Sequence, residues 1–224
     1  RYTRDFIHSY KYIRDYIIKN NINIVYTNTA VVFPGALAAK HIGIKNVWHI
    51  REIINNRFER YIISRIVNHY ADNIIANSKA TGYSISKNNK KLRIVYNGIE
   101  NKNKNKSSIS NKGNEFIIGM AGRINRWKGQ KLFVDAAEII NKKYKTVKFR
   151  IAGTAYAGEE WIEEDLKKYI EEKGLQNSID LLGQVSNMDD FYNSIDIFIL
   201  PSIQPEPFGL VVLEAMEMRK PVIS

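Results

Sequence analysis

The sequence contains no cysteine, which excludes disulfides and thiolate metal sites and is compatible with a reducing cytosol. It also lacks an apolar run of about 18 residues and a basic-then-apolar leader, so we expect neither a membrane span nor an export signal. There is no Asp-x-Asp metal motif, and no Gly-x-Gly-x-x-Gly loop follows a predicted strand. The sequence therefore predicts no metal site and gives no sign of a dinucleotide-binding loop.

The composition is that of a soluble globular protein, with 44% hydrophobic and 25% charged residues in a chain of 224. Positive charge is concentrated in residues 1–110, which hold 19 Lys and Arg against 6 Asp and Glu. Three interpretations are open: a Lys- and Asn-rich composition without further meaning, a face for anionic lipid or a lipid-phosphate acceptor, and a nucleic-acid surface. The last is disfavoured because no base-reading motif accompanies the charge.

Hydrophobic periodicity predicts helices that alternate with short strands along the whole chain. This alternation indicates an α/β protein with mainly parallel, doubly wound sheets. In the first half we expect helices over 6–20, 32–41, 56–70 and 79–87, and buried strands over 24–26, 46–50, 73–76 and 92–96. In the second half we expect strands over 116–120, 147–152, 179–182 and 197–200, and helices over 129–142, 160–173, 188–194 and around Glu214.

The junction between the halves is predicted at Asn97-Gly98, a dipeptide that favours a tight turn. The low-complexity residues 101–112 that follow have too few apolar groups to pack, so we expect a solvated loop. The chain opens within a helical pattern and stops at 221–224, which has the pattern of a buried strand beginning. We therefore expect that part of the native fold is missing at each end of this sequence.

The predicted helix 56–70 has an unusual face, on which aromatic and apolar residues from Phe58 to His69 lie among three arginines. Packing of this face against a sheet is the ordinary interpretation. Contact with a membrane is the alternative, supported by the basic charge and the aromatic content.

Two stretches carry residues suited to bind an anion. Gly122 allows the backbone to approach a ligand closely, and Arg123 and Lys128 place two cations after a strand end. Further along, Glu206 lies in a proline-flanked loop before a helix that contains Glu214. The first N–H groups of that helix favour a phosphate, and Glu214 lies about 7 Å beyond them. The alternative for each of these side chains is an ordinary surface charge.

The pattern of Glu206 and Glu214 with seven residues between them resembles the signature of retaining glycosyltransferases of family 4, which have the GT-B fold. The resemblance extends in the family's order over most of the chain. It includes Trp48-His49-Ile50-Arg51-Glu52, Ala76-Asn77-Ser78-Lys79, Tyr96-Asn97-Gly98-Ile99 and Gly122-Arg123-Ile124-Asn125-Arg126-Trp127-Lys128-Gly129.

The resemblance implies a role for each site residue. Glu206 and His49 would act at the donor sugar. From the residues alone, His49 beside Trp48 is interpreted as a half-buried packing residue, and the resemblance favours the role at the sugar instead. Glu214 would accept from ribose hydroxyls, and Val185 would lie beside the base. Backbone N–H groups would be offered to phosphate or sugar by Phe208, Gly209 and Leu210. Arg123 and Lys128 would stabilise the departing diphosphate, in place of a metal.

The resemblance further implies two Rossmann-like domains facing a cleft, both incomplete here. The expected division is an acceptor-side domain over 1–98, a hinge and polar loop over 99–114, and a donor-binding domain over 115–224.

The implied activity is transfer of a hexose-type sugar from a nucleotide diphosphate sugar to a hydroxyl acceptor, in cell-surface polysaccharide or glycolipid synthesis, without metal or further cofactor. The expected location is the cytoplasm, with the inner face of the membrane as a possible docking site. A nucleotide-sugar epimerase of the same fold and a non-catalytic nucleotide-binding module are alternatives. No residue pattern selects uridine, guanosine or adenosine.

Overall fold

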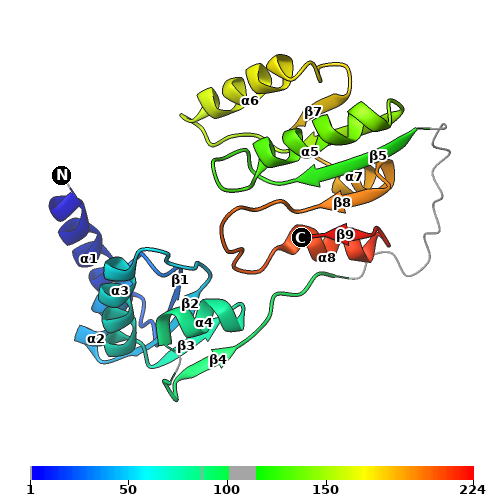
Figure 1. Ribbon diagram of the computed structural model, residues 1–224. Helices are drawn as coiled ribbons and strands as arrows, with labels where there is room; N and C mark the ends of the chain where they lie inside the picture. Colours follow the sequence, from blue (N-terminus) through cyan, green and yellow to red (C-terminus); the bar gives the residue numbers. More distant parts are fainter. Residues whose placement is uncertain (1, 87, 101–114) are drawn as a thin grey trace. The chain divides into compact units, whose positions relative to one another are not determined.

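The computed structural model describes residues 2–86, 88–100 and 115–224 of the chain, which is an α/β protein as predicted (Figure 1). Contacts divide it into two compact units. The first comprises Arg1–Gly98 with Glu206–Phe208, and the second comprises Ile99–Pro205 with Gly209–Ser224. Each unit is built on one sheet whose described strands all pair in parallel.

The first unit has a sheet of four strands in the order β1-β2-β3-β4, so each strand lies beside the one before it in the sequence. Its elements are α1 (Tyr2–Lys19), β1 (Ile24–Asn28), α2 (Pro34–Ile42), β2 (Lys45–Ile50), α3 (Arg57–Tyr70), β3 (Asn73–Ala76), α4 (Lys79–Ser86) and β4 (Leu92–Ile94).

Local sequence signals explain where these helices begin and end. The side chain of Asn56 caps α3 by accepting from the N–H groups of Phe58 and Glu59. Ser78 caps α4 as predicted, since its Oγ accepts from Thr81 N at 3.1 Å. Gly43, in the left-handed region at φ +83°, ends α2. Most of the predicted helix starts and stops agree with the structure within two residues, but α1 begins at Tyr2, four residues before the predicted start.

The core of the first unit lies on one side of its sheet, where Trp48, Ile50 and Ile74 are buried against α2, α3 and α4. The strand around residues 24–26 exists, but the prediction that it is buried is wrong, because Ile24 and Tyr26 are both more than half exposed. These two side chains alternate with Val25 and Thr27 along β1 and so lie on the opposite face of the sheet.

The second unit has a sheet of five strands in the order β7-β6-β5-β8-β9. Its elements are β5 (Phe116–Ala121), α5 (Gln130–Lys143), β6 (Val147–Ala152), α6 (Glu160–Glu172), β7 (Ile179–Gly183), α7 (Met188–Ser194), β8 (Ile197–Ile199), α8 (Leu210–Glu217) and β9 (Val222–Ile223). The order reverses between β5 and β8, and such a reversal opens a crevice at the carboxyl ends of the strands.

Helices cover both faces of this second sheet (Figure 1). On one side, Met120, Phe149 and Ile151 pack with residues of α5 and α6. On the other, Ile117, Phe198 and Ala121 pack with residues of α7 and α8. The layering places α7 and α8 together beside the crevice between β5 and β8, where the candidate site lies.

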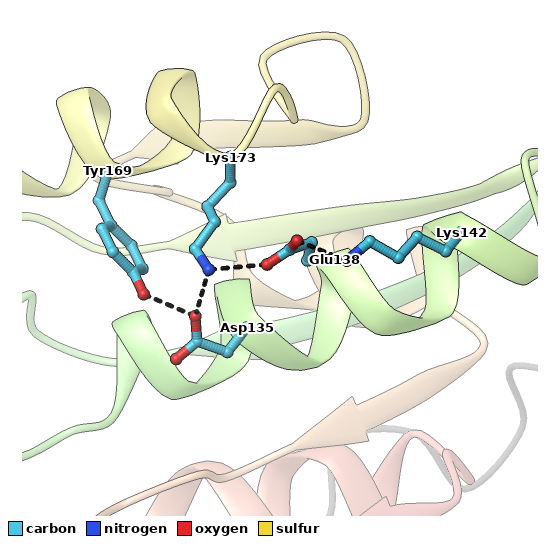
Figure 2. A network of polar contacts seen from close by, with 5 residues as sticks. All are labelled: Asp135, Glu138, Lys142, Tyr169 and Lys173. Carbon is cyan, nitrogen blue, oxygen red and sulfur yellow. Dashed lines mark hydrogen bonds and ion pairs between the residues drawn. The ribbon is translucent and has the colours of Figure 1, made fainter.

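A network of charged groups joins α5 to α6 on the surface of the second unit (Figure 2). Glu138 accepts from Lys142 and Lys173, each at 2.7 Å, and Tyr169 Oη donates to Asp135 Oδ1 at 2.6 Å. The two lysines hold the pKa of Glu138 at about 2, well below its usual value of 4.5, mainly through these hydrogen bonds. The network is a stabilising contact between helices that is remote from the crevice residues.

Two further expectations differ from the structure, and a third is not tested by it. The turn at Asn97-Gly98 is absent, since residues 95–100 form neither turn nor strand and Val95 N still bonds the carbonyl of Ala76. The terminal strand β9 forms, but Ile223 is 57% exposed rather than buried. The predicted loop over 101–112 lies outside the described residues. Within the described ranges, no helix is both long and apolar enough to cross a membrane.

Candidate active site

The loops that leave β5, β6 and β7 are hydrogen-bonded to one another at the carboxyl end of the second sheet. Gly122 N donates to Ala152 O at 2.9 Å, and Gly153 N donates to Gly183 O at 2.8 Å. Gly153 lies at φ +131°, and a Cβ there would lie 2.1 Å from Gly122 O. Because only glycine fits that approach, the loops form a compact backbone floor.

A cavity of about 400 Å³ opens above this floor. Its volume falls in the usual range for small-molecule sites. Four of the residues predicted for nucleotide binding meet in its wall, although they come from three separate parts of the second unit. These are Gly122, Arg123, Val185 and Glu214.

Two neighbouring contacts fix the backbone and side chain of Arg123. Its guanidinium carbon lies 3.5 Å from the centre of the Tyr156 ring, a cation–π contact. Its carbonyl accepts from Gln130 Nε2 at 2.8 Å. Gln130 is buried at the start of α5, so the loop is tied to the core of the unit. Arg123 is therefore a positioned cation beside the cavity.

Lys128 lies on the same loop but does not line the cavity. Asn125 Oδ1 accepts from Trp127 N at 3.1 Å and from Lys128 N at 2.9 Å, which closes the loop into a turn. The Lys128 ammonium lies 4.4 Å from the centre of the Trp127 ring. A Cβ on Gly122 would lie 3.7 Å from Lys128 Cδ, so the aliphatic stem of Lys128 passes close to Gly122.

The helix α8 supplies Glu214 and begins as the sequence predicted, directly after Gly209 at φ +79°. The N-cap residue of this helix is Gly209, which has no side chain to accept from the first N–H groups, and Leu210 is the first helical residue. Glu214 Oε2 accepts a hydrogen bond from Tyr192 Oη at 2.8 Å. Burial, and then the carboxylate of Glu214, raise the pKa of Tyr192, so its hydroxyl stays protonated and donates.

Sequence reasoning missed four residues that support the site: Asn125, Gln130, Tyr156 and Tyr192. Asn125 was within reach of local reasoning, because an Asn that bonds backbone amides two and three residues later is a common turn former. The other three act on partners 7 to 33 residues away, and no spacing rule in the sequence indicates such pairs.

In the first unit, His49 lies near the carboxyl end of β2, as predicted. Tyr26 Oη is hydrogen-bonded to His49 Nδ1, while His49 Nε2 has no partner among the described residues. Burial, and then the charge of Arg51, lower the pKa of His49, which keeps the ring neutral near pH 7. Neighbouring Glu52 accepts from the backbone N–H groups of Ala30 and Arg51 at 2.9 and 3.2 Å.

The remaining predicted residues, Glu206 and Phe208, are grouped with the first unit. They are joined through Gly209 to α8 of the second unit. Their predicted contacts with a donor sugar and diphosphate thus remain predictions. Among the residues that the structure describes, no three His, Asp or Glu side chains cluster as metal ligands do.

Comparison with known proteins places the chain in a family. The sequence profile of the family described as "Glycosyl transferases group 1" matches residues 101–224, which is more than half of the chain. The chain belongs to the group 1 glycosyltransferases. The matched residues include the whole second unit from β5 onward and therefore every residue that lines the cavity.

Relatives of this group 1 chain include two bacterial proteins. The chain is 32% identical over 108 residues to the lipopolysaccharide core biosynthesis mannosyltransferase LpsB of Rhizobium meliloti, and this match covers 48% of the chain and 30% of LpsB. It is 24% identical over 225 residues to an uncharacterized glycosyltransferase of Haemophilus influenzae, covering 99% of this chain and 62% of that one.

Solved structures share the fold. The Anabaena protein HepE in complex with UDP and glucose superposes with a TM-score of 0.80 at 27% identity, covering 89% of this chain and 58% of HepE. A glycosyltransferase from Rickettsia africae gives a TM-score of 0.75 at 24% identity, covering 97% of this chain and 61% of that one. The chain thus spans about 60% of the length of relatives that it matches nearly end to end.

Proposed function

We propose that the protein is a retaining glycosyltransferase that moves a hexose from a UDP-sugar to a hydroxyl acceptor. The observation that carries the proposal is the cavity in which Arg123, Val185 and Glu214 meet above the floor of strand-end loops. Its place beside the reversal of strand order is where parallel sheets bind nucleotides. The choice of uridine is supported by HepE, whose structures contain UDP, UDP-glucose, or UDP and glucose.

In this proposal the cavity binds the nucleoside and α8 receives the diphosphate. Glu214, oriented by Tyr192, accepts from the ribose hydroxyls, and Val185 lies beside the base. The first N–H groups of α8, at Gly209 and Leu210, point their partial positive charge at a phosphate, together with the N–H of Phe208.

Arg123 and Lys128 supply the electrostatic part of catalysis. When the bond between the anomeric carbon and the diphosphate oxygen breaks, negative charge grows on the leaving phosphate. Cations that are already held in place stabilise this state without reorganising. Arg123 is held by Tyr156 and Gln130, and the backbone of Lys128 by Asn125. We therefore propose that no metal ion is required.

Glu206 and His49 complete the proposed chemistry at the sugar. Glu206 would bind sugar hydroxyls and stabilise positive charge near the anomeric carbon, and His49 would approach the same sugar as a neutral imidazole. The acceptor oxygen attacks the face from which the diphosphate departs, and the leaving phosphate takes the acceptor proton. This sequence retains the anomeric configuration.

The proposed acceptor is a growing cell-surface polysaccharide or glycolipid, at the cytoplasmic side of the membrane. The relatives include LpsB, named for lipopolysaccharide core synthesis, and CapH of Staphylococcus aureus, named for capsular polysaccharide synthesis. The excess of basic residues in positions 1–110 is suited to an anionic membrane surface, on which such acceptors are assembled.

The test is calorimetric titration of UDP, GDP and ADP into the chain with EDTA present. We expect UDP to bind, and Glu214→Ala to weaken binding at least about fivefold, since a hydrogen bond to a charged group is lost. Glu217→Ala, on the same helix but outside the cavity, is the matched control. Binding of UDP that Glu214→Ala leaves unchanged would contradict the proposed site, and dependence on a divalent ion would contradict the metal-free mechanism.

A further inference from the structure

Helix α3 of the first unit presents apolar and aromatic side chains to solvent. The helix buries Ile63 and Val67 against the sheet, yet Phe58 is 72% exposed and Tyr61 59%. Ile62 is 41% exposed. The ordinary interpretation, that this helix packs on the sheet, holds for Ile66, which packs against the core beside Ile63 and Val67. It is wrong for Phe58, Tyr61 and Ile62, which lie on the outward side of the helix. Single exposed apolar side chains are ordinary, but neighbouring ones that form a contiguous patch commonly mark a contact with a partner.

A basic hollow adjoins this exposed face. It encloses about 440 Å³ and is lined by Arg57, Arg60, Tyr61, Ser64, Arg65 and Ser84. Among the residues that the structure describes, no Asp or Glu lines it. Three arginines of a single helix thus line one hollow.

The hydrogen bonds around the hollow leave its arginines as the available donors. Ser64 Oγ donates to the carbonyl of Ile85, and Ser84 Oγ donates to that of Thr81 at 2.7 Å. Arg65 contacts Tyr61, donating to its Oη at 3.3 Å and lying 5.7 Å from the centre of its ring. Arg57 and Arg60 form no ion pair with a residue in the described ranges, so their donors face solvent or a ligand.

The chemistry of the hollow fits phosphate. A guanidinium presents parallel N–H donors that match phosphate oxygens, and it gives up its hydration more readily than an ammonium group. The exposed Phe58 and Ile62 beside it indicate that the phosphate belongs to a lipid headgroup rather than to a soluble molecule. A helix with apolar side chains next to arginines lies stably at the boundary between headgroups and acyl chains.

We propose that α3 docks the protein on an anionic bilayer, with headgroup phosphates bound by Arg57, Arg60 and Arg65 and with Phe58 and Ile62 inserted beside them. In this proposal α3 is the part of the protein that contacts the membrane, and the proposal rests on the membrane location given under the proposed function. It is independent of the donor cavity, which lies in the other unit.

The test is co-sedimentation of the whole chain with vesicles of phosphatidylcholine, with and without phosphatidylglycerol. We expect binding only to the anionic vesicles, and weakening by added salt. The variant Arg57→Gln/Arg60→Gln/Arg65→Gln should bind about 100-fold more weakly, since each basic residue at such a surface contributes roughly fivefold. Phe58→Ser/Ile62→Ser should also bind more weakly, with all charges kept.

A matched control removes the same charge from another helix of the same unit. Arg4→Gln/Lys11→Gln/Lys19→Gln changes three exposed cations of α1. We expect it to retain most vesicle binding. An equal loss in both triple variants would overturn the proposal, because net charge rather than α3 would then drive binding.

Two further readouts separate other outcomes. If the chain binds glycerol phosphate but does not bind vesicles, the proposal is overturned, because the hollow would then take a soluble phosphate. UDP calorimetry on the α3 variant should give the affinity of the unchanged chain. Loss of vesicle binding with intact UDP binding supports the proposal, whereas absent vesicle binding by the unchanged chain overturns it without affecting the donor site.

Discussion

The replacement Tyr192→Phe tests the contact that the sequence did not reveal, the hydrogen bond between α7 and Glu214 on α8. Tyr192 is 1% exposed, and its Oη donates to Glu214 Oε2 at 2.8 Å and more weakly to Val211 O at 3.2 Å. Phenylalanine keeps the ring packing against Phe191 and Phe198. The variant therefore removes the hydroxyl and little else.

The expected magnitude follows from the burial of the two partners. A hydrogen bond to a charged group contributes about 1.5–3 kcal/mol when neither partner can turn to water. Glu214 is only half-buried, so water replaces part of the lost contact. We expect a loss of about 1 kcal/mol in the free energy of unfolding. A similar loss in UDP binding, about fivefold in Kd, follows if the hydroxyl holds the carboxylate toward the ribose.

The assay is UDP calorimetry together with urea unfolding, and Tyr169→Phe is the matched control. Tyr169 Oη donates to a carboxylate of the same unit, Asp135 at 2.6 Å, in the network between α5 and α6 (Figure 2). The control should lose stability but keep its affinity for UDP. Only the loss of the hydroxyl at Tyr192 should affect both measurements.

A Tyr192→Phe variant that binds UDP as tightly as the unchanged chain, while Glu214→Ala does not, would refute the orienting role of Tyr192. Glu214 would then contact the nucleotide without help from the hydroxyl. Equal weakening of UDP binding by the Tyr169 and Tyr192 variants would also refute it, because the effect would then be general instability rather than orientation of one carboxylate.

Two further predictions concern stability. Gly129→Ala should destabilise the second unit far more than Gly158→Ala. Both glycines have a positive φ, which costs an alanine about 1–2 kcal/mol. Only at Gly129 would the added Cβ also clash, because it would lie 1.8 Å from Pro201 O. Urea unfolding of both variants measures the difference, and equal losses would contradict a clash at Gly129. Glu138, with its pKa lowered to about 2 from 4.5, adds stability that is present above pH 4.5 and lost as pH falls toward 2. Glu138→Gln should therefore flatten the decline in melting temperature over that range, whereas Glu164→Gln, exposed on the neighbouring helix, should follow the unchanged chain.

Much of the fold was predictable because its signals are local. Strands 73–76 and 147–152 and helix 188–194 have the predicted bounds, since apolar runs, caps and turn residues act within a few positions. The turn predicted at Asn97-Gly98 does not form, and the chain before it, at Val95, is hydrogen-bonded to Ala76 at the end of β3. A turn propensity in two residues is a weak signal that tertiary context can override.

Burial was predicted less well than secondary structure. Ile24 and Tyr26 have the pattern of a buried strand, and Phe58 and Ile62 that of a packed helix face, yet all four are exposed. Apolar character shows that a side chain can be buried, but the neighbouring elements decide whether it is. On α3 the sheet meets Ile63 and Val67, which turns the aromatic face outward.

The sequence by itself determined the alternation of strands and helices, the parallel α/β class, and the two stretches that carry Arg123 and Glu214. Those features follow from periodicity and from motifs a few residues long. Only the tertiary structure decided that these residues meet in one cavity and that Tyr156, Gln130 and Tyr192 hold them there. The physical reason is that such contacts join elements through the packing of the whole sheet, and residue spacing along the chain does not encode them.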